Sequence, residues 1–324
     1  MKAVIQNRYG AADTLSVQEQ PIPKPLDHQV LLRVKAVSVN DFDWSLITGR
    51  PFLYRLMFGL LKPKTKVAGI ECAGVIASCG SSVKDFTVGD RVYGDISAFG
   101  FGAFAQFLKI DHRALKLMPD HLKFEQAAAI PHAALLAWQG LRLANLGSGE
   151  KLLINGAGGG VGFFAQQYAK TLGCQTIGID SVQKLSYLTN LDFDETFDYE
   201  RHDFTKKNLQ LDVIIDAKTN RPFWHYLRAL KSGGIYVTVG GELGKIFQIL
   251  LVAPFLKFFS RKKLKILALR PNEGLEEVAN WLARDTEVPI DGPFALEETR
   301  QAIARFGRAE HCGKVVIKID HDSV

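Results

Sequence analysis

A glycine-rich turn is the part of the sequence whose residue types and spacing point most directly to a chemical task. Residues 151–162 read K-L-L-I-N-G-A-G-G-G-V-G, so an apolar strand leads into the turn and a helix begins directly after it. A backbone without side chains can approach a pyrophosphate closely, and the free N–H groups at the start of a helix attract its negative charge. The strand, turn and helix together predict a dinucleotide-binding site. A glycine turn without a ligand is the alternative, which the flanking pattern disfavours.

The individual glycines have different expected tasks. Against the pattern G-x-G-x-x-G, the three marked positions are Ala157, Gly159 and Gly162. We expect Gly159 to lie against the pyrophosphate and Gly162 to let the helix pack closely on its strand. The residues expected to contact the cofactor along this edge of the sheet are Gly156, Ala157, Gly158, Gly159, Gly160, Val161, Gly162, Val239 and Gly240.

An acidic residue follows the glycines at the distance where such sites bind the adenosine ribose. Asp180 ends the second strand of the pattern, about twenty residues past the turn, and a carboxylate there accepts the ribose hydroxyls and repels a 2′-phosphate. The sequence therefore favours NADH over NADPH. Ser181, Lys184 and Tyr199 are expected at the adenosine end as well. Lys184 could offset an added phosphate, or it could be a solvated helix residue.

Four further segments contain specific sequence patterns. They are S-V-N-D-F-D-W at Ser38–Trp44, V-G-D-R-V at Val88–Val92, G-A-F-A-Q-F at Gly102–Phe107 and A-A-A-I-P-H-A-A-L-L-A-W-Q-G-L at Ala127–Leu141. With the glycine turn, they make nearly the whole chain resemble the zinc-independent quinone oxidoreductase branch of the medium-chain dehydrogenase/reductase superfamily. The resemblance implies an NAD(P)H-dependent enzyme that reduces quinones or α,β-unsaturated carbonyls by direct hydride transfer. A zinc-free alcohol dehydrogenase and a nucleotide-binding structural or regulatory protein without activity stay open as alternatives.

The residues at the superfamily's metal positions disfavour a zinc ion. Residues 66–74 read K-V-A-G-I-E-C-A-G, with Ile70 where zinc alcohol dehydrogenases have a histidine ligand. The first cysteine ligand of those enzymes corresponds to the region of Val39 and Asn40, and their run of structural-zinc cysteines is missing between Tyr93 and Lys109. Tetrahedral zinc needs three or four N, S or O ligands. We therefore expect no bound metal.

Three polar residues are the candidates for catalysis. Asn40 is expected to donate a hydrogen bond to the substrate or the nicotinamide, and Asp43 to support its loop. An Asx turn closing a strand is the structural alternative for both residues. His132 follows Pro131 close to the expected site, where a proton donor would serve a reductase, although a lone histidine is more often structural.

The strand and helix patterns predict two domains of different kinds. Short strands in the first third indicate a β-rich lobe, and alternating strands and helices after residue 121 indicate a doubly wound parallel sheet. The resemblance implies a GroES-like catalytic domain at 1–120, a Rossmann domain at 121–264 and a return to the catalytic domain at 265–324. The expected elements are strands at 30–39, 74–77, 86–93, 151–155, 176–180, 212–216, 235–239 and 314–319, and helices at 124–146 (interrupted at Pro131), 161–172 and 273–283.

Composition limits the classes of partner and compartment. The 324 residues are 47% hydrophobic and 23% charged, as in ordinary globular proteins, and the net charge is +6. Dinucleotide phosphates are a sufficient anionic ligand, so we expect no nucleic acid partner. The four cysteines form no C-x-x-C pair, and the first ten residues lack the apolar core of a signal peptide, so we expect a cytoplasmic protein.

One segment combines the densest apolar and basic character in the chain. Residues 245–269 read K-I-F-Q-I-L-L-V-A-P-F-L-K-F-F-S-R-K-K-L-K-I-L-A-L, and the apolar part, broken by Pro254, is too short to span a bilayer. The resemblance implies a substrate-covering segment followed by a strand, Leu264–Leu269, that pairs across a homodimer. Contact with a membrane surface is the less favoured alternative.

Overall fold

The computed structural model describes residues 1–282 and 286–321, which fold into two compact units. The first unit contains Met1–His132, Pro271–Glu273 and the described residues from Glu287 onward. The second contains Ala133–Arg270 and the described residues of Gly274–Thr286.

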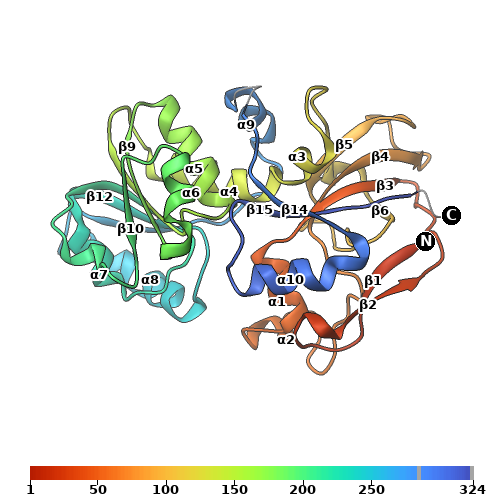
Figure 1. Ribbon diagram of the computed structural model, residues 1–324, viewed down its shortest axis with the longest axis horizontal. Helices are drawn as coiled ribbons and strands as arrows, with labels where there is room; N and C mark the ends of the chain where they lie inside the picture. Colours follow the sequence, from red (N-terminus) through yellow and green to blue (C-terminus); the bar gives the residue numbers. More distant parts are fainter. Residues whose placement is uncertain (283–285, 322–324) are drawn as a thin grey trace. The chain divides into compact units, whose positions relative to one another are not determined.

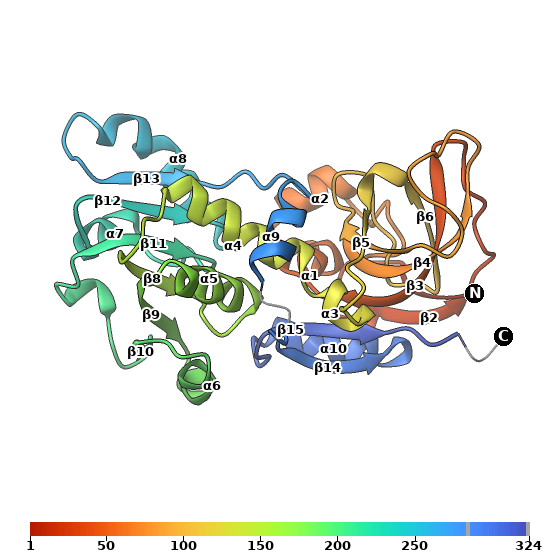
Figure 2. The same cartoon turned by 90° about the horizontal axis from the view of Figure 1, so that it is seen from above.

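The second unit is built on a six-stranded parallel sheet with the order β10-β9-β8-β11-β12-β13. Figure 2 shows these strands in succession across the sheet. The strand order reverses direction at β8. Parallel sheets bind their ligands at such a reversal, in the crevice beyond the carboxyl ends of the strands. The doubly wound Rossmann sheet expected from the sequence is thereby confirmed. The strands are β8 (Lys151–Asn155), β9 (Gln175–Asp180), β10 (Glu195–Asp198), β11 (Leu211–Asp216), β12 (Leu230–Thr238) and β13 (Lys263–Ile266).

Helices cover the two faces of this sheet because alternate strand residues point to opposite sides. Tyr226 and Ile249 belong to the buried cluster that also holds Ile214 and Tyr236 of the sheet. Gly140 lies close to Ile215, which belongs to the other face. The helices are α4 (Pro131–Ala144), α5 (Gly160–Thr171), α6 (Leu185–Asn190), α7 (Phe223–Ala229), α8 (Leu243–Leu256) and α9 (Leu275–Trp281), with short 3₁₀ turns at Val182–Lys184 and Phe204–Lys206.

The first unit is organised around a seven-stranded sheet with the order β14-β15-β3-β4-β5-β7, in which β6 also pairs with β3. The last strand, β15, pairs antiparallel with β3, so the end of the chain completes the sheet begun near its start (Figure 1). The strands of this sheet are β3 (Gln29–Ser38), β4 (Glu71–Cys79), β5 (Arg91–Asp95), β6 (Phe107–Asp111), β7 (Lys116–Leu117), β14 (Ile290–Ala295) and β15 (Lys314–Lys318). A separate pair is formed by β1 (Lys2–Gln6) and β2 (Leu15–Glu19).

Short helices close the ends of this sheet. Asn40 precedes α1, and Asp43 accepts the Asn40 N–H in a capping box that fixes the start of the helix. The core is apolar and runs through β3, β4, β5 and β15. The helices are α1 (Asp41–Thr48), α2 (Leu53–Phe58), α3 (Phe124–Ala128) and α10 (Thr299–Gly307), with 3₁₀ turns at Ala12–Thr14, His112–Ala114 and Leu296–Glu298.

The observed elements depart from the expected ones in a few places. The helix break at Pro131 is present, and Pro131 itself is the first residue of α4. The first N–H groups of a helix have no partner within the helix, so a proline at this position removes no helical hydrogen bond. Pro254 does not break α8, which continues to Leu256, but it cannot donate a backbone hydrogen bond to the carbonyl of Leu250. The strand expected at Leu264–Leu269 is observed at Lys263–Ile266. Ala283, the expected end of the last helix of the second unit, lies outside the described residues.

Candidate functional site

The glycine turn joins β8 to α5 at the point where the strand order reverses. Gly156 has a φ of +87°, which favours glycine, and the N–H groups of Gly156 and Ala157 both donate to the carbonyl of Ile179 at 3.0 Å. Gly159 is the N-cap of α5 and, being glycine, has no side chain that could cap the helix. The turn is therefore held against β9, and the first N–H groups of α5 stand beside it.

The space around the glycines fits a pyrophosphate. A Cβ on Gly162 would lie 2.1 Å from the Ala157 carbonyl oxygen, so glycine is required there for the helix to pack. A Cβ on Gly159 would find only the Gly156 carbonyl oxygen within 4 Å, at 3.7 Å. The fold therefore leaves space beside Gly159, as a ligand at the helix N-terminus requires.

Asp180 lies at the end of β9 and its carboxylate faces the turn. Oδ2 accepts the N–H of Gly158 at 2.7 Å, and Oδ1 accepts the N–H of Ser181 at 2.9 Å. The Lys184 ammonium lies 3.8 Å from Oδ1, and the Tyr199 N–H donates to the Asp180 carbonyl. The structure thus gathers the expected adenosine-end residues around Asp180. Lys184 is only 5% exposed, so its interpretation as a solvated helix residue is wrong.

A second group of polar residues forms hydrogen bonds among the carboxyl ends of β8, β11 and β12. Buried Asp216, at the end of β11, accepts hydrogen bonds from the Asn155 amide at 2.9 Å and the Tyr236 hydroxyl at 3.0 Å. The Val239 N–H donates to the Asp216 carbonyl, and Gly240 accepts a hydrogen bond from Thr219. These contacts hold Val239 and Gly240 at the carboxyl ends of the strands.

Lys218 is a candidate ligand residue that the sequence reasoning missed. Its side chain is exposed and lies 3.2 Å from the position of a Cβ on Gly156, so a cation stands beside the glycine turn. The available signal was its position two residues after Asp216, because residues following a parallel strand reach the ligand crevice.

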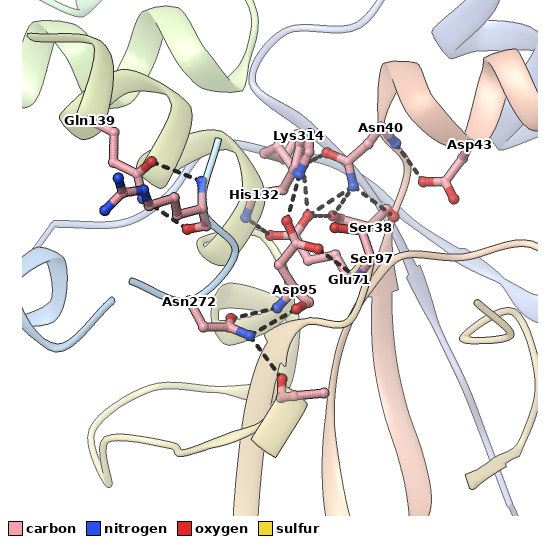
Figure 3. A network of polar contacts seen from close by, with 12 residues as sticks. Ser38, Asn40, Asp43, Glu71, Asp95, Ser97, His132, Gln139, Asn272 and Lys314 are labelled. Atoms are coloured by element: carbon pink, nitrogen blue, oxygen red, sulfur yellow. Dashed lines mark hydrogen bonds and ion pairs between the residues drawn. The ribbon is translucent and has the colours of Figure 1, made fainter. Parts of the chain in front are cut away.

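A buried polar network occupies the first unit, and Glu71 is at its centre (Figure 3). Glu71 Oε2 accepts hydrogen bonds from the Ser38 hydroxyl, the Asn40 amide at 3.0 Å and the Lys314 ammonium at 3.0 Å. Oε1 accepts the backbone N–H of His132 at 2.8 Å. Glu71 and Lys314 are both fully shielded from water, and their ion pair is satisfied by additional hydrogen bonds, as a buried pair must be.

The amide of Asn40 is engaged within this network. Its Oδ1 accepts from Lys314 at 2.6 Å while its Nδ2 donates to Glu71. Asp43 receives the Gly69 N–H at 3.0 Å besides that of Asn40. Burial raises the pKa of the Asp43 carboxyl to about 7, although these two N–H groups and nearby cations oppose the shift. Both residues therefore lie together, as expected, and fix the connection from β3 to α1.

His132 forms a dyad with Asp95, which the sequence reasoning missed. The imidazole Nδ1 lies 2.7 Å from Asp95 Oδ2, and the carboxylate is held by the Ser97 N–H at 2.9 Å. The Asn272 amide donates from Nδ2 to the Asp95 carbonyl at 2.8 Å, and its Oδ1 accepts the Asp95 N–H at 2.9 Å (Figure 3). Within residues 1–282 and 286–321, Nε2 of His132 has no hydrogen-bond partner, and 15% of the side chain is exposed. The ring is oriented through one nitrogen and can exchange a proton through the other.

Charges around the dyad favour protonated His132. Burial lowers the pKa of His132, but the charge and hydrogen bond of Asp95, together with Glu71, outweigh burial and the repulsion from Lys314, so the pKa is raised above its ordinary value. For Asp95, burial raises the pKa, but the charge and hydrogen bond of His132 hold it below its ordinary value. The pair is thus stabilised as carboxylate and imidazolium.

The residues at this site do not fit a zinc ion. Ile70 is buried beside Glu71, Asn40 offers only an amide, and the Nδ1 of His132 is bound to Asp95. Across the described ranges, no group of three or more His, Cys, Asp or Glu side chains is arranged to hold a metal. A structural or catalytic zinc needs such a group.

Known proteins resemble the chain over nearly its full length. A family model described as an alcohol dehydrogenase GroES-like domain matches residues 26–120, and one described as a zinc-binding dehydrogenase matches residues 191–317. The chloroplastic NADPH-dependent alkenal/one oxidoreductase of Arabidopsis thaliana is 30% identical over 329 residues, which are 98% of this chain and 79% of the relative. The 2-methylene-furan-3-one reductase of Solanum lycopersicum is 28% identical with the same coverage of both proteins, 98% and 79%.

A solved structure agrees with these sequence relatives. The quinone oxidoreductase of Coxiella burnetii superimposes with a TM-score of 0.87, at 25% identity, over 99% of each chain. The fold, the glycine turn and the relatives lead to one conclusion. The chain belongs to the medium-chain dehydrogenase/reductase superfamily, in its quinone oxidoreductase-like branch, and is an NAD(P)H-dependent oxidoreductase.

Proposed function

We propose that the protein reduces quinones or C=C bonds conjugated to a carbonyl group, by direct hydride transfer and without zinc. The observation that carries this proposal is the His132–Asp95 dyad, because it offers an oriented proton donor at a position without metal ligands. Reduction of a conjugated C=C bond requires one hydride and one proton. Such a donor is of no use to a protein that only binds a nucleotide.

The cofactor would be held by the residues around the glycine turn. Gly159 and the N-terminus of α5 fit the pyrophosphate, Asp180 the adenosine ribose, and Lys218 the charge of the phosphates. The bound cofactor supplies the hydride. We further propose a preference for NADH, since the Asp180 carboxylate would repel a 2′-phosphate.

His132 completes the reduction by donating a proton from Nε2. Hydride addition to an enone leaves a negative charge shared between its carbonyl oxygen and the α-carbon, and the Nε2 proton neutralises that charge. The neutral imidazole then recovers a proton from water while Asp95 keeps the ring orientation. Asn40, Asp43 and Lys314 act as positioning residues in this proposal, because their polar atoms are bound within the network.

A substrate panel tests the proposal. NADH and NADPH oxidation would be measured with quinones, enones and aldehydes, and NAD(P)⁺ reduction with simple alcohols. We expect turnover of quinones or enones with either reduced cofactor and little turnover of alcohols. Preferred alcohol oxidation would favour the alcohol dehydrogenase alternative, and cofactor binding without any turnover would favour the regulatory one.

We also propose a cytoplasmic homodimer. β13 is the edge strand of its sheet and pairs with β12 alone among the described strands, so its outer edge can pair with a second copy. The four cysteines are free thiols, which suits a reducing compartment.

A further inference from the structure

The positive charge of the protein is concentrated in one segment. Residues 243–272 contain seven Lys or Arg residues and no Asp or Glu. The whole chain has 40 basic and 34 acidic residues, so the rest has 33 and 34 and a net charge of −1. The net charge of +6 therefore resides entirely in this segment, which comprises α8, β13 and the chain around them.

The same segment exposes large apolar side chains. Ile249 is the buried residue of α8, whereas Phe255 is 64%, Phe258 71% and Phe259 87% exposed. Phe247, Leu250 and Leu251 of α8 are each more than half exposed. An exposed apolar patch of this kind marks a contact surface in a globular protein.

The basic side chains beside these rings divide into two groups. Lys262 and Lys265 donate to the carbonyls of Leu227 and Leu143, so they also anchor the segment to its unit. Lys257, Arg261 and Lys263 are exposed, and none of them belongs to an ion pair of the described residues, although the Lys257 ammonium lies 5.1 Å from the centre of the Phe258 ring. These three cations remain available to an external anionic surface.

A segment in the first unit repeats this combination. Residues 44–70 contain five Lys or Arg residues and no Asp or Glu. Phe52, Leu56 and Met57, in and next to α2, are each about 60% exposed, and Leu61 is 89% exposed. In both units the positive charge accompanies exposed apolar side chains, which is the composition of a membrane-surface contact.

We propose that α8 and the chain that follows it as far as Lys263 dock the protein on an anionic lipid surface. The exposed phenylalanines would enter the headgroup region, and Lys257, Arg261 and Lys263 would lie among the lipid anions. No helix among the described residues combines the length and apolar character needed to cross a bilayer.

The exposure of α8 changes the balance between the two interpretations of this segment. α8 packs on the core of its own unit through Ile249, Ala253 and Leu256, and it exposes its largest side chains, Phe247 and Phe255. A surface contact with lipid accounts for the apolar side chains and for the unpaired cations together.

Co-sedimentation with vesicles tests the proposal on the full chain. Vesicles of phosphatidylcholine with 30 mol% phosphatidylserine, taken as about the anionic fraction of a cytoplasmic leaflet, would be compared with pure phosphatidylcholine. One variant carries Phe255→Gln, Phe258→Gln and Phe259→Gln, and its control changes the exposed Leu26, Val88 and Leu117 to Gln. A second variant carries Lys257→Gln, Arg261→Gln and Lys263→Gln, and its control changes the exposed Lys24, Lys84 and Lys109 to Gln.

The proposal expects the wild type to bind the anionic vesicles and to be released by salt. Loss of the three cations should weaken binding roughly 100-fold, about fivefold for each charge near the surface. Loss of the three rings should weaken it at least about tenfold. The control variants should bind like the wild type, and thermal unfolding should show that all four variants fold.

Three outcomes would overturn the proposal. The first is an absence of binding to anionic vesicles. The second is binding that the control variants weaken as much as the α8 variants do. The third is a phenylalanine variant that binds vesicles normally but dissociates a dimer or raises the KM for substrate, which would assign the face to a second copy or to substrate cover.

Discussion

Replacement of Asp95 by Asn should move the pH dependence of enone reduction to lower pH. Asp95 Oδ2 lies 2.7 Å from His132 Nδ1, and a carboxylate at such a distance raises the pKa of the imidazole because it favours the charged form. Without that charge, burial and the Lys314 ammonium both favour the neutral imidazole. The pKa of His132 should then fall.

The direction in which kcat changes with pH depends on which protonation state of His132 donates the proton. The reaction needs protonated His132, so kcat is constant below the pKa of His132 and decreases as the pH rises above it. In Asp95→Asn this decrease should begin at lower pH. A hydrogen bond to a charged group contributes about 1.5 to 3 kcal/mol, so the variant should lose about tenfold or more in kcat at a pH above both pKa values. At a pH below both values the two enzymes should have similar rates.

Initial rates of reduced-cofactor oxidation with an enone, measured from acidic to alkaline pH, provide the assay. His132→Gln is the companion variant, because it removes the ionising ring and should abolish this pH dependence with a loss of about 10²- to 10⁴-fold in rate. Asp85→Asn is the matched control, since it removes the carboxylate from another aspartate–histidine pair, Asp85 and His112, outside the network. A decrease in kcat at the same pH in the wild type and Asp95→Asn would refute the role of the dyad.

Three further predictions concern the cofactor and the assembly. Gly159→Ala should weaken dinucleotide binding, measured by calorimetric titration, at least about tenfold. The fold should stay stable, because the added Cβ meets only an oxygen at 3.7 Å. The control Gly244→Ala, whose Cβ has nothing within 4 Å, should bind the dinucleotide normally. Unchanged affinity in Gly159→Ala would contradict the pyrophosphate assignment. Asp180→Asn should raise the affinity for NADPH relative to NADH about tenfold, because it removes the charge while keeping an acceptor for the Gly158 N–H. Equal ratios of the two dissociation constants before and after the change would mean that another residue governs the choice. Light scattering should report a dimer, and the double substitution Leu267→Asp and Leu269→Asp, just beyond β13, should yield monomers, whereas a dimer that persists would place the interface elsewhere.

The local patterns of the sequence were enough to predict the parallel sheet of the second unit and the glycine turn between its first strand and helix. Strand β8 begins and ends at the expected residues, and α5 is displaced by one residue, because apolar periodicity and the glycine turn are properties of neighbouring residues. The placement of Asp180 beside Gly158 also followed from the sequence. Parallel strands that alternate with helices bring their carboxyl ends to one edge, so residues after consecutive strands meet there.

Tertiary structure alone decided which polar groups make the dyad and the network. Asp95 and His132 are 37 residues apart, and Glu71 and Lys314 are 243 apart. No period or spacing connects such positions, because they meet only when β4, β5 and β15 join one sheet and α4 begins beside it. The burial of Lys184 could not be predicted either, because a sequence shows that a residue is charged but not whether other segments of the fold bury it. Local order is encoded by adjacent residues, whereas desolvation and proximity depend on the packing of distant segments.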